Sequence, residues 1–293
     1  NIPNGDPFTG EQRYDEETKK ILVSDVRIKR FVRTYLEDIE GEHIYVSENT
    51  GAGKTDSKGV LTWIAQKWNT NQKTDIAEIM KELIDVRLFG GISTLDKNMK
   101  VGKQEFVNGH VQFTGPVQFA ALNPSLNRVN LRMHQNTSHF TSKDDKAQGA
   151  ISTTTLVPYS VVQIHGWINP TVAKNTDLKE DDLQKMFKAL WYGTGGEGSS
   201  FSRSKVGQNS LLLLVIDYKQ DFDKVYGVDR TIKLEPNEEG MKDEQIRSME
   251  DYTLDFSKLK DLAKNDKIEK IRFYTEIDKI KNELNGEKFE EMS

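Results

Sequence analysis

The order of helical and strand-like patterns along the chain constrains its fold more than any other feature. Apolar residues at helical spacing predict a helix over residues 24–39, begun by Ser24 or Asp25. Strand-like segments (111–121, 126–133 and 157–169) follow, then a helix capped by Thr176 or Asp177 and a buried strand over 210–218. With one more strand before Asn1 this order would be β-α-β-β-α-β, so the sequence predicts a ferredoxin-like α+β fold.

The other segments are less regular. Residues 1–20 are rich in turn formers and charges and predict a loop, and 43–46 resembles a short strand. Apolar spacing from Thr74 or Asp75 predicts a helix that stops at Gly90-Gly91, and further helices are predicted near 256–264 and 276–286. We expect a core over 1–222 with insertions at 42–75, 92–110 and 134–152, and a charged, partly helical extension over 223–293 packed on that core.

Composition excludes several classes of protein. The 293 residues contain no cysteine, which excludes disulfide scaffolds, cysteine-ligated zinc and thiol catalysis and fits a cytoplasmic location. No apolar stretch approaches the roughly 18 residues that would span a bilayer, so no membrane partner is expected. The five histidines lack a metal-binding spacing, and we expect no metal and no cofactor.

Charge is unevenly distributed. The net charge is −5, but residues 215–293 hold 15 Lys and Arg against 21 Asp and Glu, so the remainder is nearly neutral. Within that remainder, residues 24–34 carry four basic residues and one acidic residue. Because local patches decide what touches a phosphate, an acidic protein of this kind can still bind nucleic acid.

The loop over 47–59 contains Gly-Ala-Gly-Lys-Thr at 51–55. Gly53, Lys54 and Thr55 match the end of a phosphate-binding P-loop, but Glu48 occupies the position of its first glycine. A carboxylate there would repel phosphate, so a plain loop is favoured. A nucleotide-binding protein that uses this loop remains an alternative.

Seven short segments occur together in a characteristic order. They are Pro-Asn-Gly-Asp-Pro at 3–7, Ser-Asp-Val-Arg-Ile-Lys-Arg at 24–30, Asp-Val-Arg-Leu-Phe-Gly at 85–90, Thr-Gly-Pro-Val-Gln-Phe at 114–119, Val-Pro-Tyr at 157–159, His-Gly-Trp-Ile-Asn at 165–169 and Ser-Arg-Ser-Lys at 202–205. Together they resemble the backbone subunit family of type I CRISPR Cascade complexes, in its I-B/I-C branch. The resemblance covers about residues 1–218.

This resemblance implies a modified RNA-recognition (RRM-like) palm with inserted finger and thumb elements, the inserts at 92–110 and 134–152 being the thumb candidates. It implies antiviral defence: copies of the subunit bind crRNA in a helical filament, contact other Cascade subunits and display the guide for pairing with a target DNA strand. In such a complex the target sequence is recognised by base pairing with the guide, while the protein contacts the RNA backbone. The type I family has no nuclease activity, so no enzyme is expected; an RNA endonuclease of the type III kind remains an alternative.

The first group of candidate RNA-binding residues lies at the predicted helix start. Lys29 and Arg30 follow that start, where helix amides and partial positive charge favour phosphate. We expect them to grip the RNA backbone together with Arg27 or Arg33, although Arg27 could instead pair with Asp25 or Asp85.

A second group lies in the glycine- and serine-rich loop over 193–208. Its small residues permit close backbone approach, and Arg203, Ser204 and Lys205 would contact crRNA phosphates. A third group, Arg132, His134 and Gln135, lies where a strand enters the polar insert and is expected to contact RNA or a neighbouring subunit.

Three further segments near these groups carry expectations of their own. Family relatives often carry a basic residue before Val-Pro-Tyr, where this chain has only hydroxyl residues at 152–155. The segment 115–119 is expected to fix a bend in a strand, because Pro116 cannot donate a ladder hydrogen bond. Trp167 and Trp191 are expected in the core.

Overall fold

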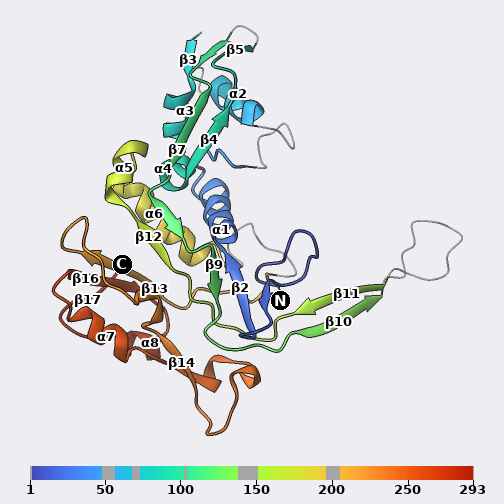
Figure 1. Ribbon diagram of the computed structural model, residues 1–293, viewed down its shortest axis with the longest axis vertical. Coiled ribbons are helices and arrows are strands. Elements are labelled where there is room, and N and C mark those ends of the chain that lie inside the picture. Colours follow the sequence, from blue (N-terminus) through green and yellow to red (C-terminus); the bar gives the residue numbers. More distant parts are fainter. Residues whose placement is uncertain are drawn as a thin grey trace, which may run out of the picture.

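The computed structural model describes residues 2–47, 57–67, 73–101, 104–137, 151–195 and 205–292. The Gly-Ala-Gly-Lys-Thr segment, Arg203 and Ser204 lie outside the described residues, so the expectations placed on them stay predictions. Helices alternate with sheets of two or three strands, which confirms the α+β class (Figure 1). None of the helices in the described ranges is long and apolar enough to cross a membrane.

The centre of the molecule is built around α1 (Asp25–Asp38) and α6 (Glu180–Tyr192), which pack against each other. Ser24 precedes α1 as its N-cap residue, as predicted, while α6 begins at Glu180, later than predicted. The apolar face of α1 joins α4 (Ile84–Phe89) and α6 in one buried cluster that includes Leu36 and Met186. Burial of these apolar side chains is what holds the two main helices together.

The strand that directly precedes α1 lies within the described residues. Residues 1–20 are not all loop, because β1 (Tyr14–Asp15) pairs with β2 (Lys20–Ser24), which runs directly into α1. Ile21 and Val23 lie on the same face of β2, and both side chains are buried. On its other side β2 pairs with β9 (Leu122–Pro124).

The remaining central strands form separate small sheets. β8 (Val117–Phe119) pairs with β12 (Gly166–Ile168), whereas β13 (Leu213–Tyr218) pairs with β16 (Ile268–Tyr274), which also pairs with β17 (Phe289–Glu291). The hydrogen-bonded ladders of the described residues therefore do not join the central strands into one four-stranded sheet. The RRM-like palm stays a prediction, and the short strand predicted over 43–46 is wrong.

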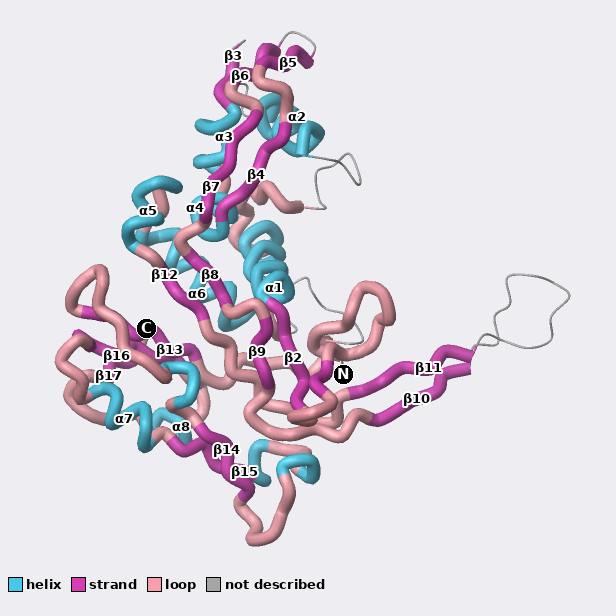
Figure 2. The backbone as a smooth tube through the Cα atoms, viewed as in Figure 1, coloured by secondary structure: helices cyan, strands magenta, loops and turns pink. Residues whose placement is uncertain are grey.

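An upper lobe extends from α1 and α4 (Figure 2). Its helices are α2 (Ser57–Lys67) and α3 (Ile76–Glu82), and its strands are β3 (Lys73–Asp75), β4 (Gly90–Thr94), β5 (Asn98–Val101), β6 (Gln104–Val107) and β7 (His110–Thr114). These elements bury a core of their own around Met80 and Phe106. The helix predicted from Thr74 to Gly90 is present but breaks at Leu83 into α3 and α4. The predicted inserts 42–75 and 92–110 thus fall in the same lobe.

Two further parts complete the molecule. A hairpin of β10 (Arg132–Thr137) and β11 (Ile151–Leu156) projects as an arm away from the centre (Figure 1). The C-terminal lobe holds α7 (Ser257–Ala263) and α8 (Asp278–Glu283), as predicted, together with β14 (Lys233–Pro236) and β15 (Tyr252–Asp255). Its core packs against the side chains of β13, which ties this lobe to the centre.

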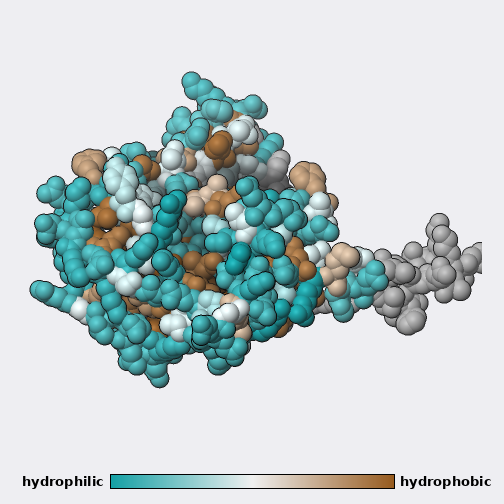
Figure 3. Space-filling model, turned by 60° about the horizontal axis from the view of Figure 1, so that its bottom comes forward, coloured by the Kyte–Doolittle hydropathy of each residue, from teal (hydrophilic) through white to brown (hydrophobic). Residues whose placement is uncertain are grey.

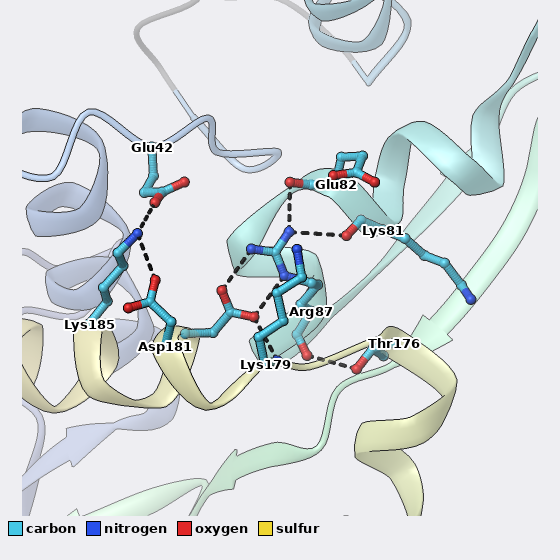
Figure 4. Close-up of polar contacts among 9 residues, drawn as sticks. Glu42, Lys81, Glu82, Arg87, Thr176, Lys179, Asp181 and Lys185 are labelled. Carbon is cyan, nitrogen blue, oxygen red and sulfur yellow. Dashed lines mark hydrogen bonds and ion pairs between the residues drawn. The ribbon is translucent and has the colours of Figure 1, made fainter.

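A buried ion pair joins the upper lobe to α6 (Figure 4). Arg87 donates from Nε and Nη2 to the two carboxylate oxygens of Asp182, at 2.8 and 2.7 Å, and from Nη1 to the carbonyl of Glu82 at 2.7 Å. Thr176, at the end of α5 (Pro170–Thr176), donates to the carbonyl of Arg87. Because Arg87 is satisfied on every side, it fixes the orientation of α4 against α5 and α6.

Candidate nucleic-acid interface

The start of α1 is braced by the N-terminal turn. The backbone N–H of Ser24 donates to the side-chain oxygen of Asn4 at 2.6 Å. The backbone N–H of Asn4 donates in turn to the side-chain oxygen of Gln12 at 2.9 Å. All three residues are buried. The Pro-Asn-Gly-Asp-Pro segment is therefore a support for the helix start, a role that its turn-forming composition did not reveal.

Arg27 extends from this braced helix start, and no carboxylate of the described residues forms an ion pair with it. Its guanidinium stacks on the Phe31 ring at 4.1 Å, and its Nε atom is buried with no hydrogen-bond partner among the described residues. Burial, with the charge of nearby Arg30, lowers the pKa of Arg27 to about 10. Arg27 and exposed Arg30 are three residues apart and so lie on one face of α1.

Lys205 adds a third cation to this group from a distant part of the sequence. Its ammonium group donates to the carbonyls of Ile2 and Pro3, the latter at 3.0 Å. Burial and the charge of Arg27 lower the pKa of Lys205 to about 8. The end of the predicted glycine- and serine-rich loop therefore returns to α1.

The glycine- and serine-rich loop begins at the end of α6, where the backbone packs closely against α1. A Cβ atom on Gly193, which ends α6, would lie 3.0 Å from the carbonyl oxygen of Phe31 and 3.2 Å from Cβ of Tyr35. Only a residue without a side chain allows this close approach. One end of the loop thus packs against α1, and the other end contacts the N-terminal turn near Arg27.

We call Arg27, Arg30 and Lys205 the cationic cluster. Like charges held together lower each other's pKa and oppose folding. Within the described residues no carboxylate forms an ion pair with Arg27 or Lys205, which instead repel each other. A cluster of this kind gains most from an anionic ligand, because phosphate oxygens accept charge-assisted hydrogen bonds from guanidinium and ammonium groups.

Lys29 and Arg33 have other partners. Lys29 is 12% exposed and donates to Asp25 and to Gln118, both at 3.3 Å. Arg33 pairs at 2.9 Å with Asp85, which is fully buried and also accepts the amides of Tyr45 and Val46. The pairings considered for Arg27 are thus made by Lys29 and Arg33, and Arg33 acts in packing the upper lobe.

The third predicted group lies on the β10–β11 arm. Arg132, His134 and Gln135 are all exposed, and they face Leu156, Thr154 and Thr153 across the hairpin. Arg132 and His134 share one face of β10, while Gln135 lies on the other. The hydroxyl residues that precede Val-Pro-Tyr therefore stand directly beside the predicted group. The RNA contacts of this group stay a prediction.

Three other predictions meet different outcomes. Gly115 packs tightly, since a Cβ there would lie 2.0 Å from the carbonyl carbon of Phe89, so the bend at 115–119 is structural. Gln118 within it was missed as a partner of Lys29. Trp167 is 41% exposed rather than in the core. In the described ranges no three His, Asp or Glu residues are grouped to hold a metal ion.

Comparison with known proteins defines the class of this chain. The family model of "CRISPR-associated protein Cas7" matches residues 1–257. The chain therefore belongs to the Cas7 family, which confirms the resemblance to the CRISPR backbone subunits; the I-B/I-C branch stays a prediction. A protein of Haloferax volcanii described as "CRISPR-associated protein Cas7" is 26% identical over 270 residues, which cover 88% of this chain and 77% of that protein.

Two solved structures give weaker matches. A chain of a "CRISPR RNA-guided surveillance complex, pre-nicking" aligns with a TM-score of 0.49 and 10% identity, covering 97% of this chain and 92% of that one. A chain of a "CRISPR RNA-guided surveillance complex" aligns with a TM-score of 0.47 and 11% identity, covering 94% and 82%.

Proposed function

We propose that this protein is a crRNA-binding backbone subunit of a type I CRISPR surveillance complex, with antiviral defence as its role. Copies of the chain assemble helically along the guide RNA, contact the other subunits and hold the guide for pairing with a target DNA strand. The protein binds without cutting, and it works in the cytoplasm. Family membership supports this proposal, and the relatives named as parts of RNA-guided complexes agree with it.

The observation that carries the proposal is the cationic cluster at the start of α1. A subunit that must hold any guide needs contacts to phosphate and sugar, because base contacts would restrict the sequence. Arg27, Arg30 and Lys205 offer charge and guanidinium hydrogen bonds at a helix N-terminus, an arrangement that suits a phosphate. The stacked Arg27 side chain is held in place by Phe31, so little side-chain freedom is lost on binding.

Purification of the protein with its cellular RNA tests this proposal. We expect the parent protein to carry small RNA, seen as a high ratio of absorbance at 260 nm to that at 280 nm. The triple variant Arg27→Gln, Arg30→Gln, Lys205→Gln should lose most of that RNA. A control that removes the same charge elsewhere, Lys258→Gln, Lys264→Gln, Lys267→Gln on and beside α7, should retain it. Equal RNA content in both variants would contradict the role of the cluster.

Binding without cleavage needs its own test. Protein loaded with guide RNA is incubated with complementary RNA and Mg²⁺, and the products are separated by length. We expect intact RNA, since the proposal assigns no catalytic residue. Regularly spaced cuts would instead support the RNA endonuclease of the type III kind.

A further inference from the structure

An apolar groove opens between the central helices and the C-terminal lobe. Its volume is about 1030 Å³, and its walls come from α6, from the segment that contains β12, and from β13. Leu183, Phe187 and Leu214 are among the side chains that line it. On the face shown in Figure 3, hydrophobic residues lie in hollows surrounded by hydrophilic ones. The three residues of the cationic cluster do not line this groove, but they adjoin it, because Pro3 and Phe31 line it and contact Lys205 and Arg27.

The groove carries large side chains that are left in water. Ile164 is 40% exposed, Trp167 41% and Phe222 87%, and all three line the groove. The centroids of the Trp167 and Tyr218 rings are 5.8 Å apart, so these two side chains connect the wall that contains β12 with the wall that contains β13. Exposed apolar side chains gathered in one concave region mark an interaction site more often than a neutral surface.

Two strands of the groove each have one edge that pairs with no other strand of the described residues. β13 is the outer strand of the β13–β16–β17 sheet, and β12 is the outer strand of its pair with β8. Both strands line the groove. The backbone groups on the free side of β13 can therefore pair with an added strand, whose alternate side chains would enter the apolar walls.

The rim of the groove is acidic. Glu180, Asp221, Asp223 and Glu269 line it, and none of them forms an ion pair with another described residue. The two basic residues of the lining are already neutralised, Lys270 by Glu290 at 2.7 Å and Arg272 by Asp217 at 2.6 Å. An acidic rim repels the phosphates of RNA and DNA and attracts a cationic polypeptide.

We propose that this groove binds an extended segment of a partner protein in which apolar side chains alternate with Lys or Arg. The segment adds to β13 as a further strand, its apolar side chains cover Trp167 and Phe222, and its basic side chains meet the acidic rim. This surface lies beside the cationic cluster but consists of other residues, and it gives the protein a second, protein-specific contact.

The test uses the full chain and a fluorescent eight-residue peptide of alternating Val and Lys, with a peptide of alternating Val and Glu as its matched control. We expect fluorescence anisotropy to show binding of the Val-Lys peptide at least about tenfold tighter than that of the Val-Glu peptide. The variant Asp221→Lys, Asp223→Lys should remove or reverse this preference. Phe222→Ser should weaken binding of the Val-Lys peptide without reversing it.

The location of the peptide is checked separately. Because the chain has no cysteine, Gln220→Cys places one thiol on the groove wall, and its reaction with a maleimide should slow when the Val-Lys peptide is bound. Amide hydrogen exchange in β13 should slow as well. Equal affinity for the two peptides, an unchanged preference in the Asp221→Lys, Asp223→Lys variant, or displacement of the peptide by a single-stranded RNA oligonucleotide would overturn the proposal. Retained RNA binding in the groove variants shows that they are folded.

Discussion

The basic side chains of α1 differ in whether a carboxylate forms an ion pair with them. Lys29 and Arg33 are four residues apart on one face and contact Asp25 and Asp85, whereas Arg27 belongs to a neighbouring face and contacts no carboxylate of the described residues. The helical period therefore places Lys29 and Arg33, with their carboxylate partners, on a different face from Arg27. Sequence reasoning found all four cations but could not sort them, because Asp85 reaches the helix only through the tertiary fold.

The two faces can be told apart by substitution. Arg33→Met should lower the free energy of unfolding by about 3–5 kcal/mol, because it leaves buried Asp85 without its charged partner. Arg30→Met, on the exposed side, should leave stability nearly unchanged and weaken RNA binding. Urea unfolding and RNA titration of both variants give the comparison. Loss of RNA affinity in a stable Arg33→Met variant would contradict this division.

The low pKa of Lys205 makes RNA binding depend on pH. In the free protein this lysine loses its proton near pH 8, while a bound phosphate favours the charged form and raises the pKa. Binding therefore takes up a proton above about pH 8, and affinity should fall as the pH rises from 7 to 9.5, by up to about tenfold for each pH unit above 8. Lys205→Arg, which stays charged, should flatten the profile. A profile unchanged by this substitution would show that Lys205 does not meet the RNA.

At the scale of elements, local patterns predicted helices better than strands. The helices α1, α7 and α8 follow from apolar spacing and short-range caps. In contrast, 126–131 and 157–165 read as strands but form no ladder beyond an isolated bridge between Ser125 and Val162, because a ladder needs a partner strand from elsewhere. β2 was missed because its alternation spans only five residues beside a charged segment, although buried Ile21 and Val23 gave a signal.

The turn between α4 and β4 depends on one glycine. Gly90 has φ of +78°, and a Cβ atom there would lie 2.3 Å from the carbonyl oxygen of Phe113. Gly90→Ala adds a backbone clash to the conformational strain and should lower the unfolding free energy by well over about 1 kcal/mol. Gly227 has a similar φ of +77° with open space around it, so Gly227→Ala measures the strain alone. Equal losses in the two variants, measured by thermal unfolding, would show that the contact with Phe113 is unimportant.

At the scale of the whole molecule, Arg87 and Asp182 join the upper lobe to the centre. Their side chains are 7% and 3% exposed, and removal of one partner leaves the other charge buried. We expect Arg87→Met to cost about 3–5 kcal/mol of unfolding free energy. Arg230→Met, at a side chain that is 85% exposed, is the control and should have no measurable effect in the same urea titration. A small loss for Arg87→Met would mean that apolar packing alone orients the lobe.

The sequence predicted the α+β class and the family from short segments whose residues make specific contacts in the fold, among them Gly90, Arg87 and Asn4. It named Arg27, Arg30 and Lys205 as candidate RNA-binding residues, whose RNA contacts stay a prediction. It could not show that Lys205 lies beside Arg27, nor that the strands divide into small sheets, since both depend on contacts between residues far apart in the chain. Nor could the sequence show that residues of the C-terminal lobe line the groove with the acidic rim.

The salt dependence of RNA binding tests the central claim most directly. Affinity for one single-stranded RNA is measured over a range of salt concentrations for the parent protein, for the Arg27→Gln, Arg30→Gln, Lys205→Gln variant and for the α7 charge control. Each phosphate contact adds about 0.7 to the slope of log affinity against log salt, so the cluster variant should lose about 2 from that slope while the control keeps the parent value. A cluster variant with the parent's slope would show that the RNA lies elsewhere on the protein.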